Sequence, residues 1–118
     1  MTNDRVREFC LALPHATESI QWENDLLLKV AGKMFAVLVL EPHDVWLSFK
    51  CTEEDFRELT ERPGIIPAPY LARHHWVALE TRDALTQSEL RHQLRRSYEL
   101  VLEKLPKKTR AQLKMKTA

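Results

Sequence analysis

The sequence is poor in glycine and cysteine. Only two glycines occur among 118 residues, and neither belongs to a GxSxG, Walker A or dinucleotide-binding pattern. Few backbone positions can therefore cradle a phosphate or present a nucleophile. Two cysteines, Cys10 and Cys51, are too few for a disulfide framework or a four-ligand zinc site. We expect reduced thiols in the core, no metal, no cofactor and no catalytic residue.

Long apolar runs are also missing. No stretch approaches the roughly 20 apolar residues that a membrane-spanning helix requires. The opening MTNDRVREF lacks the apolar run of a signal peptide. The length and the hydrophobic content of 44% are those of one globular domain over residues 1–118. These features predict a cytoplasmic protein that does not contact a membrane.

Acidic residues are absent from the C-terminal segment PKKTRAQLKMKTA. Residues 1–90 carry 9 Lys and Arg against 15 Asp and Glu, a net charge of −6, whereas residues 91–118 carry 9 against 2, a net charge of +7. The overall charge of +1 hides this asymmetry and is too small for a uniformly basic DNA-binding protein. A basic helix end, with a basic tail from about residue 106, therefore follows an acidic body.

Hydrophobic periodicity predicts an α+β fold. Apolar residues at helical spacing, with proline after them, predict an N-terminal helix, a middle helix and a long C-terminal helix over residues 3–13, 52–61 and 86–105. Asn3 and Thr52 are the expected caps of the first two helices, and Thr86 with Glu89 is the expected capping box of the third. Short runs rich in β-branched and aromatic residues predict strands over residues 19–22, 26–30, 34–40, 45–50 and 77–79. We expect an antiparallel meander sheet of four to five strands with helices packed on one side.

The run VWLSFK contains a candidate nucleic-acid surface. Strand alternation puts Trp46, Ser48 and Lys50 on the face opposite Leu47. If helices cover the Leu47 face, Trp46 and Lys50 are exposed, with Lys33 nearby in a tight turn. A tryptophan ring can then stack on a base while ammonium groups meet phosphates. The alternative is that Trp46 covers the second face of the sheet or is buried under the C-terminal tail.

The run GIIPAPYLARHHWVAL, residues 64–79, contains two prolines, two histidines and a tryptophan. The prolines predict a stiff connector that leads into a strand. Adjacent strand residues point to opposite faces, so His74 and His75 make a poor metal pair. Arg73 and His74 at the bend are candidates for phosphate contact. The alternative is a small-ligand or catalytic pocket near Trp76 and His75.

The basic C-terminal run has two interpretations. It is either an arm that contacts phosphates or a solvated helix face and tail that contact the acidic body. The phosphate-binding candidates within it are Lys107, Lys108 and Arg110. The whole run consists of Arg95, Arg96, Lys104, Lys107, Lys108, Arg110, Lys114 and Lys116.

Five stretches together give the chain a family resemblance. They are LALPHATES, KVAGKMFAVL, VWLSFKCTEEDF, RPGIIPAPYLARHHWVAL and SYELVLEKLPKKTR, and they cover nearly the whole chain in order. The sequence resembles the MmcQ/YjbR family, small bacterial proteins usually labelled as DNA-binding. The resemblance implies an α+β fold similar to frataxin and to secretion chaperones, with hairpins that form a double wing around DNA.

The resemblance also implies which positions matter. It carries over no catalytic set, and His15 stands where relatives often have glycine, as Arg82, Asp83 and Ala84 stand where they often have an Asp-Gly turn. We expect a non-enzymatic DNA-binding protein that contacts mainly phosphates. The alternative is a protein-interaction or chaperone-like module that acts through its sheet face or a dimer interface. The matching positions are Lys33, Lys50, Tyr70, Trp76, Ser97, Tyr98, Lys107 and Lys108.

Overall fold

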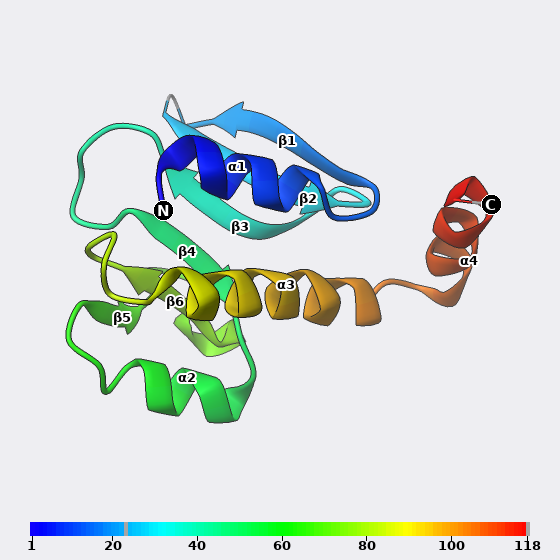
Figure 1. The fold of residues 1–118 in the computed structure, drawn as a ribbon. Coiled ribbons are helices and arrows are strands. Elements are labelled where there is room, and N and C mark those ends of the chain that lie inside the picture. The colour runs from blue at the N-terminus through cyan, green and yellow to red at the C-terminus, as the bar shows by residue number, and fades with distance from the viewer. Residues whose placement is uncertain (23, 118) are drawn as a thin grey trace.

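The computed structural model describes residues 1–22 and 24–117. These residues form a six-stranded antiparallel sheet with helices on one face (Figure 1). The strand order is β1-β2-β3-β4-β6-β5. The elements are α1 (Asn3–Leu11), β1 (Ala16–Gln21), β2 (Asp25–Val30), β3 (Lys33–Val39), β4 (Leu47–Lys50), α2 (Glu53–Leu59), β5 (Ile65–Pro67), the 3-10 helix η1 (Ala72–His74), β6 (Trp76–Leu79), α3 (Gln87–Glu103) and α4 (Lys107–Thr117).

The predicted α+β class and meander are confirmed, but the sheet has one more strand than predicted. Strands β1 to β4 pair in chain order, and β6 then pairs with β4. The extra strand is β5, which lies within the predicted stiff connector. It pairs with β6 through Ile65↔Leu79 and Pro67↔Val77. Because β5 is an edge strand, Pro67 can be accommodated although it lacks an N–H.

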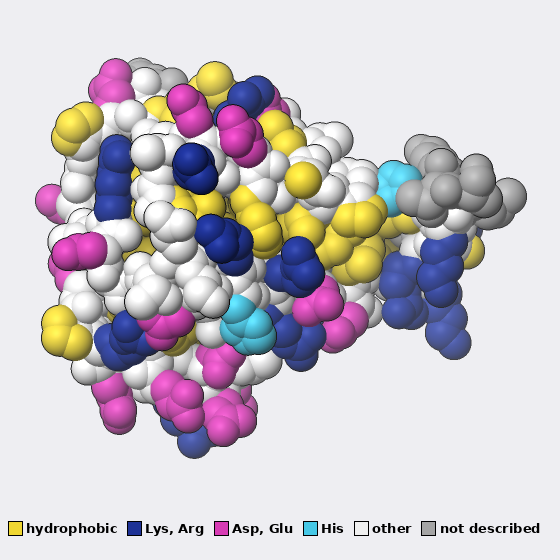
Figure 2. All heavy atoms as spheres, in the orientation of Figure 1, with side chains coloured by type: hydrophobic (Ala, Val, Ile, Leu, Met, Phe, Trp, Pro, Cys, Tyr) yellow, Lys and Arg dark blue, Asp and Glu magenta, His cyan; other side chains and the backbone are white. Residues whose placement is uncertain are grey.

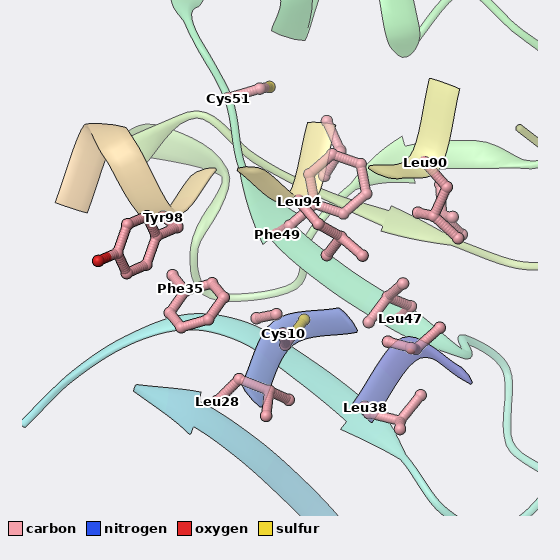
Figure 3. Close-up of a cluster of buried hydrophobic side chains, with 14 of the residues drawn as sticks. Cys10, Leu28, Phe35, Leu38, Leu47, Phe49, Cys51, Leu90, Leu94 and Tyr98 are labelled. Atoms are coloured by element: carbon pink, nitrogen blue, oxygen red, sulfur yellow. The ribbon is translucent and has the colours of Figure 1, made fainter. Parts of the chain in front are cut away.

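The main core lies between the sheet and helices α1 and α3. Val6, Phe35, Phe49 and Leu94 are completely buried there. Figure 3 shows side chains from these helices and strands meeting in one cluster. The Tyr98 ring packs edge-on against Phe35, with ring centroids 5.5 Å apart. The helices therefore cover the sheet face that the amphipathic pattern predicted.

The helix caps follow the sequence signals with one correction. The predicted capping box at Thr86 and Glu89 is present at the start of α3, and Thr52 caps α2. Helix α1 is capped by Thr2 and not by Asn3, because Thr2 Oγ1 accepts the backbone N–H of Arg5. Asn3 is the first helical residue, and its side chain is free to bond elsewhere.

The basic tail is helical. After α3 ends, Pro106 leads into α4, which stands apart from the sheet at the C-terminal end of α3 (Figure 1). The side chain of Lys116 lies outside the described part of the chain. Within residues 1–22 and 24–117, the longest helices are too short or too polar to cross a bilayer.

One serine hydroxyl bridges strands β3 and β4 where their ladder ends. Their ladder ends at Ala36↔Phe49, so Phe35 and Lys50 would form the next pair. Instead, Ser97 Oγ donates to the Phe35 carbonyl at 2.6 Å and accepts the Lys50 backbone N–H at 2.9 Å. The fully buried hydroxyl thus replaces a direct bond between the strands.

A β-bulge explains why Phe35 needs this partner. In the β2 to β3 ladder, Leu28 pairs with Ala36 and the next residue pairs with Met34, so the described register skips Phe35. A bulge leaves the extra residue outside the ladder and bends the strand. A buried carbonyl without a partner is costly, and Ser97 supplies that partner. One serine on α3 therefore fixes both the bulge and the distance between the helix and the sheet.

We expect Ser97→Ala to lower the free energy of unfolding by about 3 kcal/mol, because it leaves a buried N–H and a buried C=O without partners. Urea unfolding followed by circular dichroism measures this loss. Ser88→Ala, at an exposed position of the same helix, is the matched control and should change stability little. Equal stability of the two variants would contradict the bridging role.

Both cysteines are buried, as expected for reduced core residues. Cys10 is 0% and Cys51 1% exposed, and Cys51 Sγ lies 3.3 Å from the His75 carbonyl. Burial raises the pKa of each thiol to about 12. The thiols therefore stay protonated at neutral pH.

Because the thiolate is the reactive form, we expect both thiols to react with iodoacetamide at least about a hundredfold more slowly in the folded protein than in urea. Mass spectrometry of the labelled chain measures this at neutral pH. Fast labelling of either cysteine in the folded protein would show that it lies outside the core.

Candidate functional site

Three predicted site residues, Lys50, Arg73 and His74, lie near Lys104 at the C-terminal end of α3. The Lys50 ammonium donates to the His74 backbone carbonyl at 2.6 Å. Burial lowers the pKa of Lys50, and the nearby Lys104 ammonium lowers it further. Lys50, Lys104 and the η1 segment with Arg73 and His74 therefore lie close together. The structure joins two candidate regions that are more than twenty residues apart in the chain.

Lys50 is not the exposed phosphate contact that alternation predicted. It is only 9% exposed, and its ammonium is bound to a carbonyl of η1. The Lys50 side chain points to the predicted face of the sheet, opposite Phe49. The η1 segment covers that face. Lys50 therefore holds η1 against the end of β4 and does not reach solvent.

The prediction of an exposed Trp46 is wrong. The ring is 7% exposed and belongs to the helix-side core, where Nε1 donates to Asn3 Oδ1 at 2.7 Å. The Arg82 guanidinium lies 5.6 Å from the ring centroid. Strand β4 begins only at Leu47, so alternation does not extend to Trp46. The alternative of burial holds, but under the start of α1 and not under the tail.

The two histidines are separated by a turn and not by strand alternation. His74 is exposed at the end of η1, whereas His75 has φ = 61° and precedes strand β6. The His75 ring packs against Phe56, with centroids 5.6 Å apart. Arg73 is exposed beside His74. The bend thus presents Arg73 and His74 to solvent, and it uses His75 for packing.

The remaining candidates lie at the same end of the molecule. Lys33 follows the tight turn between β2 and β3, and Ala16 at the start of β1 pairs with Val30 just before that turn. The Tyr98 hydroxyl donates to the Pro14 carbonyl at 2.7 Å, which ties the loop before β1 to α3. A cleft of about 720 Å³ separates this loop from α4. The β2–β3 turn, the end of α3 and the start of α4 therefore lie at one end, which we call the basic end.

Positive charge is concentrated at the basic end. Lys33, Lys104, Lys107 and Lys108 are exposed, and Arg110 is half-buried. Figure 2 shows Lys and Arg side chains on α4 without acidic side chains among them, whereas the two signs are mixed over the rest of this face. On the body, several cations lie in ion pairs, such as Arg7–Glu18 at 2.5 Å and Arg62–Glu89 at 2.5 Å.

A second feature, which the sequence analysis did not find, is a groove on the helix-free face. It has a volume of about 650 Å³ and lies beside a small second cluster that contains Leu27, Trp76 and Ala78. Trp22 and Tyr70 are among its lining residues, and their side chains are 67% and 100% exposed. The sequence marks Tyr70 only as a position shared with the resembling family, and Trp22 only as the end of a predicted strand.

Both exposed aromatic residues have a left-handed backbone. Trp22 has φ = 49° and Tyr70 has φ = 67°. This region is disfavoured for bulky residues and costs of the order of 1 kcal/mol or more. No sequence pattern requires a large aromatic residue at such a turn, so neither position was predictable from the sequence.

The exposures of the tryptophans predict distinct fluorescence behaviour. All three lie within the described residues, and Trp22 is 67% exposed whereas Trp46 and Trp76 are 7% and 4% exposed. We expect Trp22→Phe to remove most of the emission that acrylamide quenches and to shift the remaining emission to shorter wavelength. Trp46→Phe is the control and should leave quenching at least as strong. Unchanged quenching in Trp22→Phe would show that this ring is covered.

Comparisons with known proteins identify the family. A family model described as YjbR matches residues 11–100. A crystal structure of a Deinococcus radiodurans protein with a DUF419 domain is similar with 31% identity and a TM-score of 0.85, over 95% of this chain and 87% of that one. The chain therefore belongs to the YjbR family, and the resemblance seen in the sequence is confirmed.

A crystal structure of a Pseudomonas syringae protein shares the fold. It has 19% identity and a TM-score of 0.70, over 85% of this chain and 98% of that one. No curated protein matches the chain significantly. The comparisons thus establish the family and the fold, and any activity has to be inferred from the surface of the molecule.

Proposed function

We propose that the protein is a DNA-binding module that contacts backbone phosphates with its basic end. The observation that carries the proposal is the segregation of charge. Helix α4 has no acidic residue, projects from the body and starts beside Lys104 (Figure 1). Its Leu113 side chain packs against the main core, and Glu99 and Glu103 of α3 line the cleft beside it. Lysine and arginine that neutralise phosphates release counterions, and this release provides most of the affinity of non-specific DNA binding.

The structure changes which residues we assign to this role. Lys33, Lys107 and Lys108 are exposed, and Arg110 is half-buried beside them. Arg73 and His74 are exposed on η1, which Lys50 connects to the same end. Trp46 and Lys50 leave the predicted contact set because both are buried.

The loss of Trp46 from the set affects specificity. Stacking on an exposed ring would favour unpaired bases, and phosphate contacts alone are tolerant of sequence. We therefore propose binding to duplex DNA with little sequence preference. We propose that the protein binds DNA without catalysing a reaction. Both cysteine thiols are buried and protonated, so neither is an available nucleophile.

The proposal predicts salt-dependent binding. Fluorescence anisotropy of a labelled duplex should show binding at low salt that weakens steeply as salt rises. The triple variant Lys107→Gln, Lys108→Gln, Arg110→Gln should lower affinity at least about tenfold and reduce the slope of log K against log salt by up to about 3.

A matched control removes three charges from the body. Arg5→Gln, Arg57→Gln, Arg91→Gln changes the net charge equally at exposed positions away from α4. This variant should lose much less affinity. The proposal fails if the protein does not bind at low salt, if binding is independent of salt, or if the two triple variants lose affinity equally.

A further inference from the structure

The groove on the helix-free face has an apolar floor. Met34, Val37 and Val45 from β3 and the segment before β4 line it, and Ala68 and Leu71 form one side. Helices α1 and α3 pack on the opposite face of the sheet, as Figure 1 shows from the helix-covered side. Within the described residues, the segment that contains η1 covers only part of this face, and the groove lies beside it. An exposed apolar surface of this kind is typical of an interaction site.

The charge of the groove is acidic. Asp25 and Glu41 are among its lining residues, and the Asn24 side chain donates to Glu41 Oε2 at 3.2 Å. None of the described lining residues is Lys or Arg, although the chain contains 18 of them. Carboxylates repel phosphate, so this surface is unsuited to the DNA that we assign to the basic end.

The aromatic side chains belong to two separate segments. Trp22 lies between β1 and β2, and Tyr70 lies before η1, so the two lining residues come from different parts of the chain. Both residues have a left-handed backbone and are largely exposed, so their rings bury little surface. Exposed Tyr and Trp give large contact areas at low entropic cost, and their faces also attract cations.

We propose that this groove binds a peptide segment of a partner protein that combines apolar side chains with Lys or Arg. The apolar floor takes the aliphatic side chains, and the carboxylates of Asp25 and Glu41 meet the cations. The rings of Trp22 and Tyr70 contact the segment from the sides. This role uses a different surface from the one proposed for DNA, so either can hold without the other.

Charge complementarity favours such a partner over a second copy of this chain. The groove of a second copy carries the same carboxylates, and face-to-face contact would place like charges together. The acid-free helix α4 has the right charge but few apolar residues among its described side chains to fill the floor.

The emission of Trp22 reports directly on occupancy. Two synthetic peptides serve as probes, one of alternating leucine and lysine and one with glutamate in place of lysine. Titrated into the protein, the lysine peptide should shift Trp22 emission to shorter wavelength and protect it from acrylamide. The glutamate peptide should do neither.

Substitutions of groove residues test which side chains bind the lysine peptide. Asp25→Asn with Glu41→Gln should weaken binding of the lysine peptide about fivefold, and Tyr70→Ser should weaken it about tenfold. Ile20→Ser, which removes another exposed apolar side chain outside the groove, is the control and should bind normally.

Three results would overturn the proposal. The first is no response of Trp22 to the lysine peptide, and the second is an equal response to both peptides. The third is a shift that grows with protein concentration in the absence of peptide, which would mean that a second copy fills the groove. DNA binding by the basic end would be unaffected in each case.

Discussion

The hydroxyl of Ser97 organises the sheet and the helix that crosses it. It donates a hydrogen bond to the carbonyl of a bulge residue, Phe35, and accepts one from the backbone N–H of Lys50. A direct bond between the strands would otherwise form at this position. The next residue of α3, Tyr98, packs on Phe35 and binds the loop before β1 through its hydroxyl. Two adjacent helical residues thus set the distance of α3 from β3 and β4. They also fix the position from which α4 leaves the body.

Two surfaces of opposite character follow from this arrangement. At the end of α3, the amide of Lys50 is held by Ser97 while its side chain holds η1, and this brings Arg73 and His74 toward Lys104 and the start of α4. On the far face of the sheet, the η1 segment covers part of the surface and an acidic, apolar groove remains beside it. The asymmetry of charge along the sequence becomes a separation of surfaces in space, because α4 projects from the body (Figure 1).

Much of the fold could be predicted from local patterns, whereas the site depended on long-range contacts. The helices, the four-strand meander and the capping box follow from periodicity and caps, which act within a few residues. Strand β5 is short and contains Pro67, so its pairing could not be recognised locally. The predicted exposure of Trp46 was wrong because strand alternation begins only at Leu47, the first residue of β4. The predicted exposure of Lys50 was wrong because η1 covers its side chain. His15 has φ = 64°, a left-handed conformation that glycine adopts without strain and that this turn imposes on a histidine.

The separation of the two surfaces is most directly tested by an amide-resolved NMR titration of the full chain with a short DNA duplex. We expect signals of residues 31–33, 72–74 and 104–114 to shift together, whereas signals of residues 24, 25, 41 and 70 stay in place. Shifts centred on the groove residues, or shifts spread evenly over both faces, would contradict the assignment of phosphate binding to the basic end.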